Sequence, residues 1–346
     1  MPSTLLLNGN ELKMLARREM TDYIIRVENL VKRFGELVAV DDISFNVVRG
    51  EIFGFLGPNG AGKTTTINIL CTLSKPTSGR ATIDGLDVVR QQSQVRRSIG
   101  LVFQDPSLDE RLSGLQNLRF HALVYSVPAS VREQRIEQLL RMVELWDKRN
   151  SQVRTYSGGM KRRLELARGL LHHPKVLFLD EPTLGLDPQT RNRMWEYILE
   201  LQQREETTIF LTTHYMDEAE KADRIAIIDY GKLVAIDTPE GLKKIVGKDI
   251  ISVKTDDNDR AVEEIRLRYR IETRHDRDGL TFEVANGEEF LPTFIKEFAT
   301  KIVSVSLRRP SLDDVFLKLT GREIRQEEVS DTFKAMVREH GRRMRR

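Results

Sequence analysis

A glycine-rich segment that ends in a lysine and two threonines begins at Gly57. It reads GPNGAGKTT, and its first and sixth positions, with the lysine and threonine that follow, fit the spacing G-x-x-x-x-G-K-[ST]. Glycines let backbone amides curl around phosphate oxygens, the lysine reaches the terminal phosphates, and the first threonine hydroxyl can coordinate Mg²⁺. The motif predicts a nucleotide-binding loop formed by Gly57, Pro58, Asn59, Gly60, Ala61, Gly62, Lys63, Thr64 and Thr65.

Two acidic residues end an apolar run, VLFLDEP, at residues 176–182. The run predicts a buried parallel strand, which would place Asp180 at its carboxyl end, beside the phosphate loop, where a carboxylate can hold Mg²⁺. Glu181, one residue further, can instead polarise an attacking water. A solvated acidic turn is the alternative for this segment alone, but the phosphate loop earlier in the chain favours the catalytic interpretation.

Gln104 and His214 also follow apolar runs, in LVFQDPS and LTTHYMDEAE. At the end of its strand, Gln104 can touch the metal or the attacking water and report nucleotide occupancy to the segment that follows. His214 can hydrogen-bond the γ-phosphate. An isolated glutamine or histidine is usually structural or solvated, so the prediction for each depends on its place at a strand end.

A second candidate anion site occurs at TYSGGMKRR, residues 155–163. Ser157, Gly158 and Gly159 predict a helix N-terminus with exposed amides, which suits an anion, and the basic run 161–163 follows in the helix. Because one loop already surrounds one face of the nucleotide, we expect this second site to bind the γ-phosphate held by another subunit. Two chains would then enclose two ATP molecules head to tail.

These residues must be positioned by alternating strands and helices. Apolar, β-branched runs predict strands at IIRVENL, LVAVDDISFNVV, EIFGFLG, KVLFLD, TTIFLTT and RIAIIDY. Between residues 105 and 165 the pattern is largely helical, with apolar residues at three-and-four spacing at Ile136, Leu139, Leu140, Val143 and Trp146. Asp187 followed by Pro188 predicts the start of another helix.

Composition divides the chain of 346 residues into two domains and two terminal segments. We expect a disordered leader at 1–21 with an alternative start at Met20, a nucleotide-binding domain at 22–246, a small α+β domain at 247–321 and a basic tail at 322–346. A net charge of +3 gives no argument for nucleic acid. The sequence has no apolar run of about 20 residues and no secretory signal, so it predicts a cytoplasmic protein. The single cysteine, Cys71, is expected to be buried and inert.

In this order, GPNGAGKTT, Gln104, YSGGM, LFLDEP, LGLDP and His214 resemble the ATP-binding cassette (ABC) ATPases over roughly residues 22–246. The resemblance implies an α/β P-loop fold with an antiparallel β subdomain and an α-helical subdomain. It also implies that Phe34 stacks on adenine, that Ser157, Gly158 and Gly159 act in trans as the signature, and that Asp187 lies in a loop that crosses the dimer interface. Tyr156 and Met160 depart from the commoner signature LSGGQ.

YSGGM and the segment SLDDVFLKLTGRE, residues 311–323, are similar to the daunorubicin-resistance type of exporter ATPase. LDERLSGLQNL, residues 108–118, is similar too, with Gln116 in place of an expected glutamate at the surface that faces the permease. This resemblance implies an ATP- and Mg²⁺-dependent ATPase that forms a homodimer, or a heterodimer with a second ABC ATPase. It would energise export of a drug-like, antibiotic-like or lipid-like substrate through a separate integral-membrane permease, at the cytoplasmic face of the membrane.

Some related ABC ATPases act instead on ribosomes or DNA without a permease. The ribosomal kind usually carries two cassettes, and the repair kind a long coiled-coil insertion. This chain has one copy of each motif and no heptad run, so a nucleic-acid partner is not expected. For the general physical role of the C-terminal domain, we favour the interpretation as a dimerising or packing module.

Overall fold

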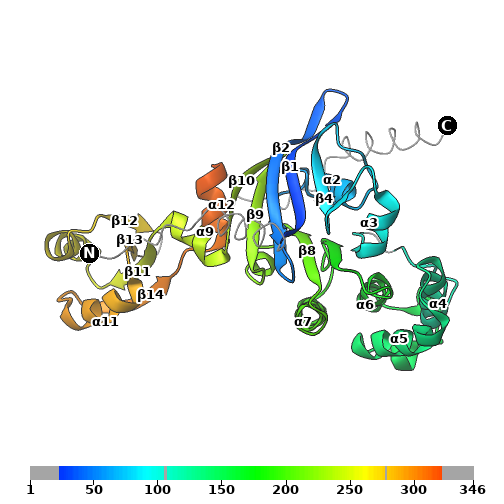
Figure 1. Cartoon of the computed structure of the whole chain (residues 1–346). Coiled ribbons are helices and arrows are strands. Elements are labelled where there is room, and N and C mark those ends of the chain that lie inside the picture. Colours follow the sequence, from blue (N-terminus) through cyan, green and yellow to red (C-terminus); the bar gives the residue numbers. More distant parts are fainter. Residues whose placement is uncertain (1–22, 105–106, 277–278, 322–346) are drawn as a thin grey trace, which may run out of the picture. The chain divides into compact units, whose positions relative to one another are not determined.

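The computed structural model describes residues 23–104, 107–276 and 279–321. The predicted leader, the alternative start at Met20 and the basic tail lie outside these described residues. The chain divides into two compact units between Ile236 and Asp237, and helices and strands of both units are labelled in Figure 1. Among the helices of the described ranges, none is long and apolar enough to span a bilayer.

The first unit contains two sheets. The smaller sheet is antiparallel, with the order β2 (Leu37–Val48), β1 (Tyr23–Phe34), β4 (Ser78–Ile83) and β5 (Leu86–Asp87). The larger sheet has the order β10 (Lys232–Asp237), β9 (Arg224–Asp229), β3 (Ile52–Leu56), β8 (Thr208–Thr213), β7 (Val176–Asp180) and β6 (Ile99–Val102). Strands β9, β3, β8, β7 and β6 are parallel, so their carboxyl ends meet at one edge.

Phenylalanines join the two sheets in one core. Phe45 of β2 stacks on Phe53 of β3 with ring centroids 5.6 Å apart, and it also packs against Phe55 and Phe210. Every residue of β3 and β7 is buried, which explains why both strands are apolar up to Asp180 at the end of β7. Cys71 lies in this core, as expected, and burial raises the pKa of its thiol.

Helices complete the first unit. They are α2 (Lys63–Leu70), α3 (Gln92–Ser98), α4 (Gly114–Val124), α5 (Ala129–Met142), η1 (Trp146–Lys148), η2 (Val153–Thr155), α6 (Gly158–Gly169), α7 (Pro188–Glu205) and α8 (Met216–Ala219). Helices α4, α5 and α6 contact one another and form a helical subdomain (Figure 1). Of the apolar residues predicted to lie on one helical face between residues 136 and 146, all are buried except Trp146. Because α5 ends at Met142, the helical repeat is lost, and Leu145 enters the core while arginines cover the indole of Trp146.

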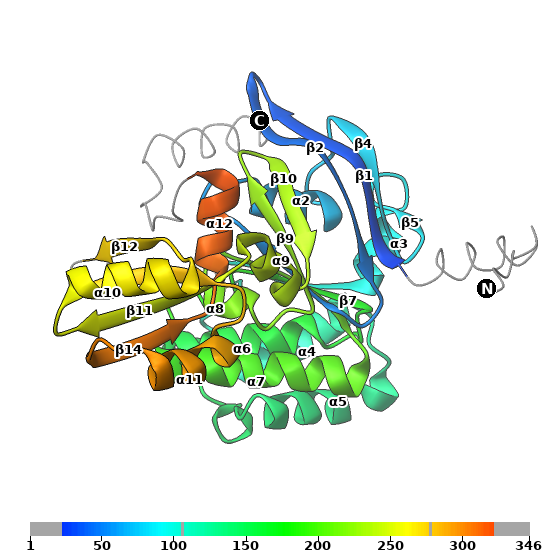
Figure 2. The same cartoon turned by 90° about the vertical axis from the view of Figure 1, so that its left-hand side faces the viewer.

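The second unit is a βαββαβ fold preceded and followed by a helix. Its elements are α9 (Pro239–Val246), β11 (Asp249–Thr255), α10 (Asn258–Glu264), the π-helix η3 (Ile265–Tyr269), β12 (Thr273–Asp276), β13 (Gly279–Val284), α11 (Gly287–Glu297), β14 (Ile302–Arg308) and α12 (Leu312–Thr320). The antiparallel sheet has the order β12-β13-β11-β14. Its inner face packs against α10 and α11, which are labelled in Figure 2.

The second unit begins earlier than residue 247, where the sequence analysis placed its start. Helix α9 packs against α12, and Lys318 Nζ donates to the carbonyl of Ile245 at 2.9 Å. These contacts hold α9 within the second unit.

Candidate active site

The glycine-rich loop connects the carboxyl end of β3 to the start of α2. The amide of Gly57 donates to the carbonyl of Thr213 at 3.3 Å, and a Cβ at Gly57 would lie 2.3 Å from the carbonyl oxygen of Ile228. Gly62, which precedes α2, has φ of 104°, a conformation that favours glycine. The local fold therefore requires glycine at both ends of the predicted loop.

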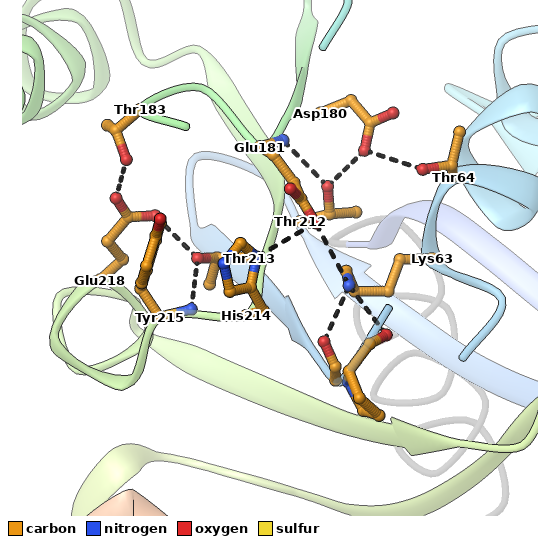
Figure 3. Close-up of polar contacts among 12 residues, drawn as sticks. Lys63, Thr64, Asp180, Glu181, Thr183, Thr212, Thr213, His214, Tyr215 and Glu218 are labelled. Carbon is orange, nitrogen blue, oxygen red and sulfur yellow. Dashed lines mark hydrogen bonds and ion pairs between the residues drawn. The ribbon is translucent and has the colours of Figure 1, made fainter. Parts of the chain in front are cut away.

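Lys63 directs its ammonium into this loop (Figure 3). Nζ donates to the carbonyl of Gly57 at 2.8 Å and that of Pro58 at 3.1 Å, and it lies 3.3 Å from Oε1 of Glu181. The side chain is 4% exposed. Burial lowers the pKa of Lys63, while the nearby carboxylates of Glu181 and Asp180 oppose that shift.

Asp180 ends β7 and accepts two hydroxyl hydrogen bonds on one oxygen. Thr212 Oγ1 donates to Oδ1 at 2.5 Å, and Thr64 Oγ1 donates to the same atom at 3.3 Å (Figure 3). Burial raises the pKa of Asp180, although both hydrogen bonds and Lys63 partly offset that effect. One carboxylate and two hydroxyls from three different elements thus converge next to the loop.

Glu181 has φ of 48°, in the left-handed region, which costs a non-glycine residue roughly 1–2 kcal/mol. Its amide is held by the backbone carbonyl of Thr212 at 3.2 Å and by Thr212 Oγ1 at 3.1 Å. Burial opposes ionisation of the Glu181 carboxyl, but His214 and Lys63 outweigh burial and lower its pKa. His214 Nδ1 lies 3.3 Å from Oε1 without the alignment of a hydrogen bond. Glu181 is therefore an ionised, buried carboxylate in a strained position, as is common at catalytic sites.

The second candidate anion site lies at the start of α6. Ser157 is the N-cap and its Oγ accepts from the amide of Met160 at 3.3 Å. A Cβ at Gly158 would meet open space, whereas one at Gly159 would lie 2.7 Å from Thr190 Cγ2. Asp187, the N-cap of α7, accepts from the amide of Thr190 at 2.9 Å and from its hydroxyl at 2.6 Å. The structure therefore groups Ser157, Gly158 and Gly159 with the predicted helix start at Asp187.

Tyr156, which departs from the commoner signature, is buried behind this helix start. Its hydroxyl donates to the carbonyl of Lys148 at 2.7 Å. The ring closely approaches Gly114, where a Cβ would lie 2.5 Å from the hydroxyl oxygen. Tyr156 therefore anchors the beginning of α6 to the helical subdomain.

The side chains of the basic run after the second site contact other residues of their own chain. Lys161 pairs with Glu110 at 2.5 Å, and Arg163 pairs with Glu144 at 3.4 Å. Arg162 is buried and its guanidinium donates to backbone carbonyls. All three side chains are thus engaged within their own chain.

Two predicted residues, Gln104 and Phe34, are exposed. Gln104 is exposed, and its carbonyl accepts from Arg162 Nη1 at 3.3 Å. Phe34, at the end of β1, is 39% exposed with Lys32 Nζ 4.8 Å from its ring centroid. Their roles toward metal and adenine therefore stay predictions.

The structure adds polar residues that the sequence analysis did not select. Thr212 lies opposite Asp180 in the register of β7 and β8, so a prediction of which strands are neighbours would have identified it. Glu218, 1% exposed, accepts hydrogen bonds from the hydroxyls of Thr183 and Thr213. This carboxyl joins the loop after Glu181 to the segment before His214, as Figure 3 shows.

This fold and site define a P-loop ATPase, and comparisons with known proteins identify its family. Residues 40–184 match the ABC transporter model, and residues 238–320 match the C-terminal domain of DrrA1-3-like ATP-binding proteins. The chain is 41% identical to the daunorubicin resistance ATP-binding protein DrrA2 of Streptomyces coeruleorubidus, over 90% of this chain and 99% of that one. It is 34% identical to the linearmycin resistance ATP-binding protein LnrL of Bacillus subtilis, over 87% of this chain and 100% of that one.

Solved structures agree with this assignment. The chain resembles cbiO1 of Clostridium perfringens, part of an ABC transporter complex, with a TM-score of 0.60, 28% identity and coverage of 72% of this chain and 96% of that one. The chain also resembles a dimeric structure of the ATP-binding cassette MJ0796 with bound ADP and Pi. The TM-score is 0.57 and the sequence identity 28%, over 62% of this chain and 98% of that one. The protein belongs to the daunorubicin-resistance family of ABC transporter ATP-binding proteins. It is a nucleotide-binding ATPase, and the resemblance and predicted fold class are confirmed.

Proposed function

We propose that two copies of this chain close on two ATP molecules and reopen after hydrolysis. The main support for this dimer is that one chain contains both halves of a composite nucleotide site. Lys63, Asp180 and Glu181 converge on the glycine-rich loop, while the exposed helix start at Ser157 and Gly158 has open space in front of it. Dimeric cassettes are known among similar structures, and a homodimer of this chain would be sufficient to form two complete sites. A heterodimer with a second ABC ATPase is the alternative.

In the proposed reaction, water attacks the γ-phosphorus in line and ADP leaves. Glu181, ionised at neutral pH because its pKa is lowered, orients the water and accepts its proton. His214 contacts the same carboxylate and helps to orient the water. Lys63 and the amides of the loop stabilise negative charge on the transferring group, and the partner's helix start would do so from the other side.

The residues present fit Mg²⁺. Mg²⁺ is usually held by one or two carboxylates together with substrate phosphates and water. Asp180 and the hydroxyl of Thr64 supply oxygen atoms beside the loop, and Gln104 remains a candidate third ligand. Among the described residues no cluster of three or more His, Cys, Asp or Glu side chains is present, consistent with a site that the nucleotide completes. When bound, the ion would neutralise charge on the phosphates.

The substitution Asp180→Asn should raise the stability of the fold at neutral pH while it lowers the ATPase rate. The raised pKa of Asp180 means that the folded chain binds its proton more tightly than the unfolded chain. Its contribution to stability is therefore lost as pH rises from the ordinary carboxyl value through the folded pKa. Asparagine keeps the Oδ1 acceptor for Thr64 and Thr212 but removes the buried charge. We expect a higher urea midpoint for the variant at pH 7, a smaller difference at pH 4, and an ATPase rate lower by about 10²-fold or more. A lower midpoint at both pH values would contradict this account.

We propose further that the ATPase energises export of a drug-like, antibiotic-like or lipid-like molecule. Relatives are named for resistance to daunorubicin, doxorubicin and linearmycin, and others for Nod factor export. ABC ATPases of this kind act with a membrane permease, so the chain would lie at the cytoplasmic face of the membrane, attached through that permease. Action on ribosomes or nucleic acid has no support among these relatives.

Purification from native membranes tests the exporter assignment. The tagged chain, solubilised in mild detergent with ATP, should bring down a protein with about six apolar spans at equal stoichiometry. That partner should stimulate ATP hydrolysis. Co-purification of the chain with ribosomes or DNA, lost at high salt, would overturn the transport role. The assignment of ATPase activity would then still stand.

A further inference from the structure

Arg162 connects three parts of the catalytic unit through its buried guanidinium. Nε donates to the carbonyl of Pro182 at 2.6 Å, and Nη2 donates to the carbonyls of Asp180 at 3.1 Å and Glu181 at 2.8 Å. Nη1 donates to the carbonyls of Phe103 and Gln104. The residue is 6% exposed. One side chain therefore binds two loops at the carboxyl edge of the sheet.

The binding of three successive carbonyls by one side chain depends on the turn at Glu181. In an extended strand successive backbone groups point to opposite sides, so they could not all face the same guanidinium. The left-handed conformation of Glu181 allows this convergence. Arg162 in turn donates to all three of these carbonyls, and the carbonyl of Glu181 also accepts from the amide of Leu184 at 3.2 Å. These bonds stabilise the conformation that places the Glu181 carboxylate.

Arg162 also lies within the helix that begins at the second candidate anion site. Helix α6 starts at Gly158, directly after Ser157, and Arg162 is in its second turn. A displacement of this helix start would therefore be transmitted through a rigid side chain to the backbone of Glu181 and Gln104. Lysine cannot reproduce the connection because its single ammonium has three donors and no planar fork.

We propose that Arg162 is a positioning residue for the catalytic base, which sets the backbone of Glu181 and couples it to the start of α6. The inference rests on the proposed function, since it takes Glu181 as the base. A residue that acts in this way should affect turnover while the nucleotide remains bound normally. A misplacement of about 1 Å at a catalytic group can lower the rate by about 10²-fold.

The test compares Arg162→Lys and Arg162→Gln with Arg163→Gln. The Arg163 guanidinium donates to the carbonyl of Val143 at 3.1 Å and to the carboxylate of Glu144 at 3.4 Å. Nucleotide affinity, single-turnover hydrolysis of ATP and thermal unfolding are measured for each. We expect kcat to fall by about 10²-fold in both Arg162 variants, with Kd for ATP within about threefold of the parent and no change in Arg163→Gln. In the Glu181→Gln background, the same Arg162 changes should lower the residual rate by less than about threefold, because the base they position is already absent.

Three results would overturn the inference. Turnover of Arg162→Lys within about twofold of the parent would show that the base is positioned without this guanidinium. An equal loss in the Glu181→Gln background would show that Arg162 acts independently of Glu181. Failure of even Arg162→Lys to fold would assign Arg162 a role in stability alone. An inactive parent chain, assayed with its permease, would instead refute the proposed function.

Discussion

Glu181→Gln should bind ATP and hydrolyse it about 10²–10⁴ times more slowly than the parent chain. Glutamine has nearly the same shape as glutamate but cannot accept the proton of the attacking water. ATP affinity should be retained or improved, because the change removes a negative charge 3.3 Å from Lys63, close to where phosphates would bind. The variant should therefore accumulate as an ATP-bound dimer in size-exclusion chromatography.

A matched control is Glu289→Gln, which makes the same chemical change at an exposed position of α11. The Glu289→Gln variant should hydrolyse ATP at the parental rate. Its elution volume in size-exclusion chromatography should not change when ATP is added. If Glu181→Gln kept near-normal turnover while Glu289→Gln did the same, another group would have to be the base. Retained dimerisation with normal turnover would leave the dimer proposal intact and remove only the assignment of Glu181.

Gly158→Val should abolish ATP hydrolysis without weakening the fold. A Cβ at Gly158 meets open space, and its φ does not require glycine. Valine is also more favourable than glycine within a helix by a few tenths of a kcal/mol. Because the side chain would project toward the approaching nucleotide and block the amides of the helix start, we expect turnover to fall by about 10²–10³-fold. Nucleotide binding to the isolated subunit should be unchanged.

Gly159→Val provides the contrasting case. A Cβ at this position would lie 2.7 Å from Thr190 Cγ2, so this substitution should also lower the melting temperature. Equal melting temperatures for the two variants would be inconsistent with the packing described here. Full activity of Gly158→Val would mean that no phosphate approaches this helix start.

Much of the fold follows from local patterns in the sequence. The buried parallel strands were predictable because β3 is a continuous apolar run of five residues and β7 has four apolar residues before Asp180, a pattern typical of strands covered on both faces. The helix start at Asp187 and Pro188 was predictable from capping chemistry. Strand β12, Thr273–Asp276, was not predicted, because its residues TRHD are polar and only its pairing with β13 makes it a strand.

The polar contacts of the site depend on non-local geometry that a motif does not contain. Lys63, Thr64, Asp180, Glu181 and His214 were selected from strand ends and the phosphate loop, and the structure brings them together. Thr212 and Arg162 were not selected from the sequence. Their hydrogen-bond partner Asp180 is 32 and 18 residues away in the chain, respectively. A basic side chain in a helix is usually solvated, so only tertiary packing identifies Arg162 as buried.

In the proposed dimer, each catalytic site is completed by the helix start of the second chain. Lys63→Ala disables the phosphate loop, and Gly158→Val disables the helix start, so each variant alone should be inactive. A mixed dimer would contain one site that is intact in both halves. We would measure single-turnover ATP hydrolysis by the two inactive variants, separately and after mixing in equal amounts. The account predicts recovery of up to about a quarter of the parental sites, since half the dimers are mixed and each has one intact site. Activity no greater than the sum of the separate variants would contradict it.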